Sequence, residues 1–280
     1  MTMRDFLGVL STYIKRGIFS PVFLICTALC GFLMMFFISS IYPTSYDDSL
    51  GLFYFLQRAE YSGSVYLIMM IAAFPAALLF YDDWKSGNFK FIISRAGRGK
   101  YAFAVTLAAG ITAAVVMILS LTVFAIYVLA KCPLIPNLDA AALRARVFGF
   151  PNSGLLCTGN VFLCYLLYFL TKGAMAAFFA VTAVFQSMIV TNKPLTVISP
   201  VLVYILYFSF NLFYILPALL NPFVLFRNGY KLYLVFGGTE DGSLFSPAAA
   251  IYPMLFCIVF TVIVSLIEIK LLRSKMNKNI

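Results

Sequence analysis

Residues 101–130 read YAFAVTLAAGITAAVVMILSLTVFAIYVLA, and no charged side chain occurs anywhere in this stretch. A helix rises 1.5 Å per residue and needs about 20 mostly apolar residues to cross a bilayer. Strands of membrane β-barrels alternate apolar and polar residues, whereas this run is continuously apolar. The stretch therefore predicts a membrane-spanning helix that is long enough to tilt or to extend past the bilayer.

The composition of the whole chain agrees with this interpretation. The chain has 280 residues, of which 63% are hydrophobic and only 11% are charged. A soluble domain carries roughly 25% charged residues. A chain of this length cannot hide so much apolar surface from water in one core, so lipid must take the place of water. We expect an all-α polytopic membrane bundle.

Six apolar runs are long enough to serve as spans. They are Pro21–Ile41, Ser64–Tyr81, Tyr101–Ala130, Val161–Val190, Leu195–Leu216 and Ser246–Leu271. The second is short and contains Pro75, which lipid tolerates when neighbouring helices satisfy the freed carbonyl. No internal repeat or separate soluble segment interrupts the pattern, so residues 1–280 are expected to form a single transmembrane domain.

The orientation follows from the basic residues, which are more frequent in cytoplasmic loops. If the N-terminus is inside, the inner set is Arg4, Lys15, Arg16, Lys85, Lys90, Arg95, Arg98, Lys100, Lys193, Lys270, Arg273, Lys275 and Lys278. The outer set is then Arg58, Lys131, Arg144, Arg146, Arg227 and Lys231. This bias predicts cytoplasmic N- and C-termini in a multi-pass protein of the cytoplasmic membrane. The net charge of +10 is then explained by topology and anionic lipid rather than by a nucleic-acid partner.

The first twenty residues form the predicted N-terminal segment, 1–20. Phe6, Leu7, Leu10 and Ile14 recur at helical spacing, and polar residues fill the other face. This pattern is typical of an amphipathic helix that lies in the plane of the inner membrane surface. The alternative is an extended first span with a polar start.

Two long connections are expected on the extracellular side, over residues 131–160 and 217–245. The first contains a predicted short helix, Asp139–Phe148, with Asp139 at its start. The second contains the aromatic stretch Phe223–Phe236, which is too polar to span and too apolar to lie in water. We expect interfacial or re-entrant short helices there, and the alternative is an amphipathic loop on the lipid headgroups.

The inner connection over residues 82–100 carries the most information about function. From Tyr81 to Lys100 the chain reads YDDWKSGNFKFIISRAGRGK, so apolar residues alternate with bases. A short helix with one apolar and one charged face is a surface that a soluble partner can bind. The alternative is that the bases only enforce topology and bind anionic headgroups.

This connection resembles the permease subunits of type-2 ATP-binding-cassette exporters. Asp83 and Gly87 match an acidic-x-x-x-Gly pattern in which Glu is more usual, and Arg95, Arg98 and Lys100 match the basic entry into the third span. In residues the resemblance covers only about Tyr81–Tyr101. The predicted layout of spans, termini and N-terminal helix extends it over the whole chain.

The resemblance implies a division of labour between two kinds of subunit. The helix after the second span would be a coupling helix that contacts a separate ATPase, present in two copies, and a second identical or similar permease would complete the pathway. The implied coupling residues are Asp82, Asp83, Lys85, Gly87, Lys90, Arg95, Arg98 and Lys100. ATP and Mg²⁺ would be bound by the ATPase, since this chain contains no G-x-x-x-x-G-K-[ST] phosphate loop and no cofactor is expected in it. The implied cargo is amphipathic or lipidic: a peptide, an antibiotic or a lipid.

Three weaker signals remain. Lys172 lies deep in the fourth apolar run, where a charge is a candidate for function; alternatively, it reaches the outer surface from the end of the span. Cys132 and Cys157 share one connection, and we expect two free thiols; the alternative is an external disulfide between them. Glu268 is expected to form a surface ion pair with the bases that follow it.

Other functions follow from other interpretations of the same residues. An intramembrane hydrolase would need a serine at the depth of Lys172, and none is identifiable; the absence of histidine excludes histidine-dependent triads. A channel or ion-coupled carrier usually keeps carboxylates within its spans, whereas the acidic residues here are assigned to loops and span ends. A membrane anchor or assembly protein is the remaining alternative. The chain itself is not expected to be an enzyme.

Overall fold

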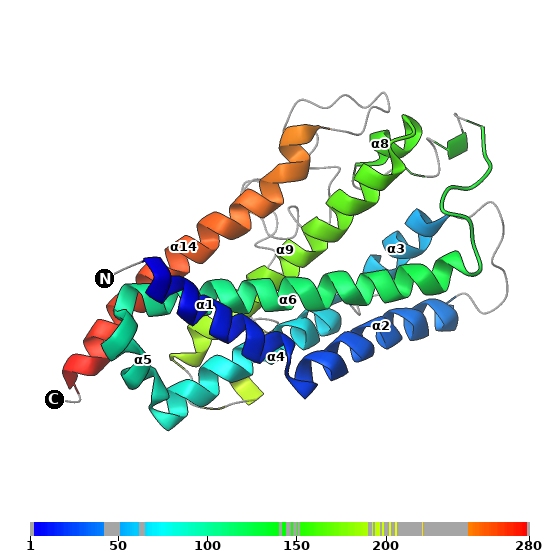
Figure 1. Cartoon of the computed structure of the whole chain (residues 1–280). Helices are drawn as coiled ribbons and strands as arrows, with labels where there is room; N and C mark the ends of the chain where they lie inside the picture. Colours follow the sequence, from blue (N-terminus) through cyan, green and yellow to red (C-terminus); the bar gives the residue numbers. More distant parts are fainter. Residues whose placement is uncertain are drawn as a thin grey trace.

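The computed structural model describes residues 3–41, 51–61, 65–139, 142–143, 147, 150, 152–189, 192, 194–196, 198, 202, 205, 220 and 246–278. The regular elements there are helices: α1 (Met3–Ile18), α2 (Pro21–Ile41), α3 (Leu52–Tyr61), α4 (Val65–Ser86), α5 (Asn88–Ala96), α6 (Arg98–Leu129), α8 (Ser153–Cys157), α9 (Val161–Ser187) and α14 (Pro247–Lys278). The all-α fold class is confirmed over this part of the chain (Figure 1).

Four of the described helices are long and apolar enough to cross a membrane: α2, α6, α9 and α14. A fifth candidate is α4, which is bent by 88° from α5 across a short break. The chain is thus a multi-pass membrane protein with four such helices, or five if the bent pair counts as one span. The predicted span Leu195–Leu216 and the connection 217–245 lie largely outside the described residues.

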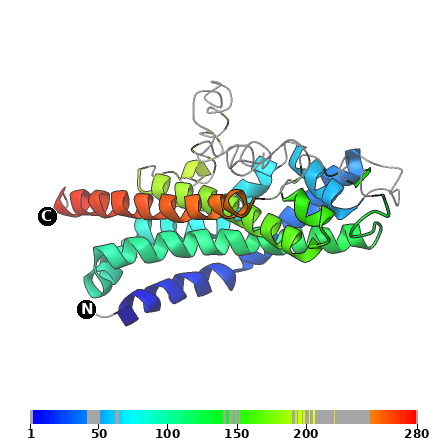
Figure 2. The same ribbon diagram turned by 90° about the horizontal axis from the view of Figure 1, so that it is seen from above.

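The central helix of the bundle is α6, which packs against α1, α2, α3, α4, α5, α9 and α14. Figure 2 shows it between α1 and α14. Small residues allow close packing against α9, because a Cβ added at Gly173 would lie 3.1 Å from Ile118 Cδ1. In lipid, such close contact between helices is a main source of association energy, because burial from water contributes little there.

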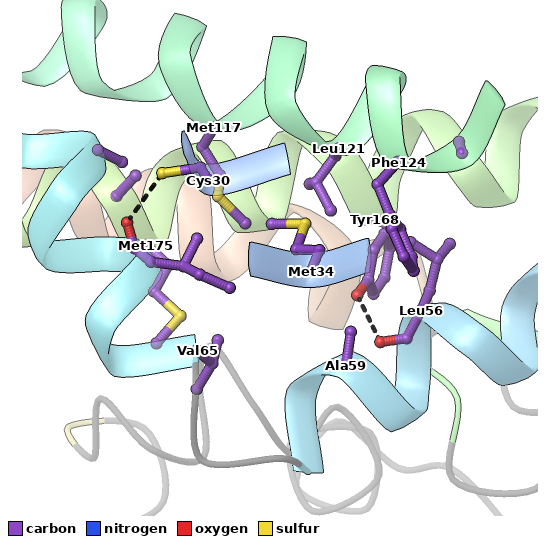
Figure 3. Packing of buried hydrophobic residues seen from close by; sticks show 14 of the residues in the cluster. Cys30, Met34, Leu56, Ala59, Val65, Met117, Leu121, Phe124, Tyr168 and Met175 are labelled. Carbon is purple, nitrogen blue, oxygen red and sulfur yellow. Dashed lines mark hydrogen bonds between the residues drawn. The ribbon is translucent and has the colours of Figure 1, made fainter. Parts of the chain in front are cut away.

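Polar side chains connect the spans within the core. The Ser120 hydroxyl of α6 lies 3.0 Å from the Thr27 carbonyl of α2, and the Cys257 thiol of α14 donates to the Ala174 carbonyl of α9 at 3.0 Å. Figure 3 shows the apolar cluster around Met34, Leu121 and Phe124, which brings together α2, α3, α4, α6 and α9. This cluster thus packs these helices against one another.

The end of the bundle near Leu129 is closed by two short helices that the sequence did not predict. Helix α3 buries Phe53 and Phe55, and the Phe53 ring meets that of Phe150 edge to face at 6.1 Å. Helix α8 is the second of these short helices, and its Leu155 and Leu156 side chains are buried. The predicted helix Asp139–Phe148 lies largely outside the described residues, but the Asp139 carboxylate accepts a hydrogen bond of 2.7 Å from the Ala142 amide, as a residue at a helix start does.

Both termini lie at the opposite end, together with α5 (Figure 1). Asp5 of α1 lies 3.6 Å from Lys100 at the start of α6, and a Cβ on the neighbouring Gly99 would approach Ile269 of α14. The sequence places both ends on one side of the membrane, and they share one end of the bundle; the assignment of that end to the cytoplasm stays a prediction.

The predicted N-terminal helix is confirmed from Met3 to Ile18. It packs along the first half of α6, since Asp5 is near Lys100 and Gly17 is near Thr112. Its tilt in the membrane is therefore tied to that of α6, and a position in the plane of the membrane surface stays a prediction.

The closest approach of α1 to α6 provides a test of this packing. A Cβ at Gly17 would lie 2.8 Å and 2.9 Å from the two γ atoms of Thr112, and rotation of that β-branched side chain cannot clear both positions. We expect Gly17→Ala to lower stability by about 1–3 kcal/mol, as overpacking does. Gly8→Ala in the same helix meets nothing within 4 Å and should stabilise by about 1 kcal/mol through helix propensity. Thermal unfolding in detergent measures both, and equal effects would contradict this packing.

Candidate functional site

The predicted coupling residues lie along the turn from α4 through α5 into α6. Asp82, Asp83 and Lys85 belong to the last turns of α4, Gly87 is the corner, and Arg98 and Lys100 open α6. Gly87 has a φ of 77°, a left-handed backbone that favours glycine, so the turn between α4 and α5 depends on this residue. Residues 82–100 thus form a corner of α4, α5 and α6, and the short helix that the sequence predicts in this connection is α5.

At this corner the Asp83 carboxylate is buried, with 3% exposure, and accepts hydrogen bonds from α1. The Tyr13 hydroxyl donates to Oδ2 at 2.5 Å, and the Arg16 guanidinium donates to Oδ2 at 2.8 Å and to Oδ1 at 3.2 Å. The ring of Tyr101 from α6 meets Tyr13 edge to face, with 6.2 Å between the ring centres. Three helices therefore converge on one carboxylate.

The electrostatics of the two donors agree with this geometry. Burial raises the pKa of Tyr13 far above its ordinary value, and the neighbouring Tyr101 and the Asp83 carboxylate add to the effect. The hydrogen bond to Asp83 raises the pKa of Arg16, whose side chain is 42% exposed. Charge-assisted, two-pronged contacts of this kind are the strong hydrogen bonds of proteins.

Burial limits what Asp83 can do. A carboxylate enclosed by α1 does not reach a partner in this conformation, so a part of Asp83 in coupling would act through the helices that it joins and stays a prediction. Instead, Asp83 holds α1 to the last turn of α4, immediately before the chain turns into α5. Movement of α5 would accordingly be transmitted to α1 and α6.

Helix α5 has the two faces that the sequence predicts. Phe89, Ile93 and Ala96 are buried against the bundle. The other side exposes Lys90, Phe91, Ser94 and Arg95, and the Phe91 side chain is 73% exposed. An aromatic ring between two cations is the composition found at protein interfaces, where aromatic residues and Arg are enriched.

A groove of about 460 Å³ separates α5 from α1. Its walls combine apolar side chains with one group of each charge, and the lining includes Asp5, Val9, Thr12, Phe91, Ile92 and Arg95. The outer face of α5 therefore continues into a concave surface shared with the N-terminal helix.

Besides Asp83, two acidic or basic residues of the described part of the chain are buried in the bundle. Lys172 is 2% exposed and its ammonium lies 5.2 Å from the centre of the Tyr168 ring. Its helix, α9, begins at Val161, and the Lys172 side chain is directed into the bundle; its depth in the bilayer stays a prediction. Its role in function stays a prediction.

Glu268 is fully buried, so the expected surface ion pair is wrong. Successive residues of a helix are 100° apart, which places Lys270 about 200° and Arg273 about 140° around α14 from Glu268. The carboxyl instead hydrogen-bonds to the Thr106 hydroxyl of α6 at 2.6 Å. A repeat of polar residues at Cys257, Thr261, Ser265 and Glu268 follows one helix face and is the signal that could have revealed this.

The six cysteines, Cys132 and Cys157 among them, are free thiols in this structure. Among the described residues, no group of three or more Cys, Asp or Glu side chains is placed to hold a metal ion.

A pair of neighbouring substitutions tests the buried carboxylate. Asp83→Ala leaves the Tyr13 hydroxyl and the Arg16 guanidinium without their acceptor, and we expect a loss of about 2–4 kcal/mol of stability. Asp82→Ala, at an exposed position one residue earlier, should change stability by less than about 1 kcal/mol, because contacts of an exposed carboxylate contribute little. Thermal unfolding and proteolysis of α1 measure the difference, and similar behaviour of the two variants would show that Asp83 does not hold α1.

The Tyr13 hydroxyl makes the stability of this corner depend on alkaline pH. An ordinary tyrosine ionises near pH 10, whereas Tyr13 keeps its proton in the folded chain. The folded state then binds more protons than the unfolded state above about pH 10, and its stability falls as the pH rises through that range. Melting temperatures measured from about pH 8 to 11 should fall less steeply for Tyr13→Phe than for the unsubstituted protein. Equal slopes would contradict the burial of this hydroxyl.

Comparison with known proteins identifies no family for the chain. No protein-family model, curated protein or solved structure matches it. Its function must accordingly be inferred from its own residues and from the corner that they form.

Proposed function

We propose that this chain is the permease subunit of an ATP-driven exporter, energised by a separate ATPase that docks on α5. The observation that carries the proposal is the position of α5: a nine-residue helix, bent by 88° from α4, at the end of the bundle that holds both termini. A short helix that lies across the ends of the spans can be displaced by a soluble partner that binds to it. Its exposed Phe91, flanked by Lys90 and Arg95, supplies the contact surface.

The contact made by Asp83 supports a mechanical role for this helix. Because Asp83 ties α4 to α1, and α1 packs along α6, a displacement of α5 would reach the central helix of the bundle without an intermediate loop. In this proposal Lys85, Lys90 and Arg95 face the ATPase, while Asp83 and Gly87 preserve the shape of the corner. Two ATPases and a second permease complete the exporter.

An apolar groove supports an amphipathic or lipidic cargo. It measures about 330 Å³ and lies between α6 and α14, with Phe6 of α1 at one side; its lining includes Leu107, Gly110, Ile111, Ile258 and Val262. A surface with almost no polar atoms binds hydrocarbon better than it binds ions or sugars.

A proton-coupled carrier is the second candidate. The observation in its favour is the burial of Glu268 within the bundle, because the sequence had placed this carboxyl at the surface. Intramembrane carboxyls are typical of such carriers. Dependence on an ATPase separates the two candidates.

The test is co-purification from the native host in mild detergent. We expect an ATPase with a phosphate-binding loop to accompany the chain, and the double variant Phe91→Ala, Arg95→Ala to lose it by at least about tenfold, equivalent to 1.4 kcal/mol. The matched control is Phe162→Ala, Arg58→Ala, which removes an exposed Phe and an exposed Arg at the other end of the bundle. The control should retain the partner. An intact, folded chain without any ATPase would contradict the proposal and favour the carrier.

A further inference from the structure

The Thr106 hydroxyl lies within hydrogen-bond distance of two oxygen atoms but has only one proton to donate. Its Oγ1 lies 2.7 Å from the Ala102 carbonyl oxygen, one turn earlier in α6, and 2.6 Å from Glu268 Oε2 of α14. Both distances are those of hydrogen bonds, yet a hydroxyl has one proton to donate. A carbonyl has none. If both contacts are hydrogen bonds, the second proton must come from the Glu268 carboxyl.

The surroundings of Glu268 favour the same state. The residue is fully buried, and its other oxygen, Oε1, has no hydrogen-bond partner among the described residues. An ionised carboxylate in that position would have one donor at most, at a high cost of desolvation. A neutral carboxylic acid leaves only a carbonyl oxygen without a donor, which costs far less.

Charged groups on the neighbouring helices do not neutralise it in this structure. On α6, Tyr101 lies within electrostatic range of both Glu268 and Asp83, and beyond it lie Tyr13 and Arg16 of α1; Arg98 and Lys100 are at the start of the same helix. On α9 the cation is Lys172. Cys257 of α14 contacts Ala174 of α9, close to Lys172, and Cys257 is about three helical turns before Glu268. Lys172 therefore lies roughly three turns from the level of Glu268. Lys270 and Arg273 of α14 are exposed. No ion pair joins Glu268 to a described cation.

We propose that Glu268 is a proton-binding site, occupied in this conformation, whose carboxylic acid donates to Thr106 and joins α14 to α6. Thr106 in turn donates to Ala102. The proton can leave only when water reaches the carboxyl, which requires α14 to separate from α6. Proton release and separation of these two helices are therefore the same event, whether or not an ATPase drives it.

Infrared spectroscopy of the full chain in lipid nanodiscs near neutral pH tests the site. The difference between the unsubstituted protein and Glu268→Gln should show the loss of one carboxylic-acid C=O band, shifted in D₂O. Asp82→Asn, which removes an exposed carboxylate, should lose carboxylate bands instead. Loss of carboxylate bands from Glu268→Gln would overturn the proposal.

A stability measurement gives an independent result. Glutamine offers the same hydrogen-bond donor without needing a proton, so Glu268→Gln should melt at the same temperature or higher. A variant that melts lower or fails to fold would indicate an ionised, paired carboxylate and overturn the proposal.

The role of Thr106 as acceptor is tested by Thr106→Val. We expect it to shift the acid band, because the carboxyl loses its acceptor. Thr122→Val, which removes the same one-turn bond to a helix carbonyl elsewhere on α6, should leave the band unchanged. An acid band that does not respond to Thr106→Val would contradict the proposed donation.

Discussion

The Asp83 carboxylate accepts hydrogen bonds from Tyr13 and Arg16 where α4 turns into α5, and the shape of this end of the bundle depends on that contact. A buried carboxylate requires donors, and both of them come from a helix 70 residues earlier in the chain. Their hydrogen bonds fix α1 against α4, and the edge-to-face contact of Tyr13 with Tyr101 continues the attachment to α6. The contacts among α1, α4 and α6 therefore hold α5 in place, with its outer face exposed.

The same end of the bundle holds a second buried carboxyl group, that of Glu268, which is stabilised in a different way. Asp83 is matched by a guanidinium, whereas Glu268 has a hydroxyl as its hydrogen-bond partner in the described structure. An acid without a cation is stable in an apolar bundle as the neutral form. One carboxyl therefore braces the corner, and the other makes contact between α6 and α14 sensitive to protons. Lys172 lies farther along the bundle, against an aromatic ring.

Sequence patterns predicted the long helices well, because a run of apolar residues is itself the signal. Pro21–Ile41 and the start at Val161 agree to the residue, and the two faces of α5 follow from spacing. Helices α3 and α8 were missed because 10 and 5 residues are too few for a criterion built on spans. The partners of Asp83 were missed because a contact over 70 positions leaves no local pattern. Glu268 was misplaced because its neighbours in sequence lie on another side of the helix.

The most direct measurement on this account is the membrane side from which α5 is reached. Ser94 is exposed on the outer face of that helix, and a membrane-impermeant thiol reagent can report on Ser94→Cys above the background of the native cysteines, of which all but the half-buried Cys157 are buried. Labelling is expected in inside-out vesicles and not in intact cells. It should fall when the co-purifying ATPase is added back. Labelling of Ser94→Cys in intact cells would place α5 outside, where no ATPase can dock, and would contradict the account.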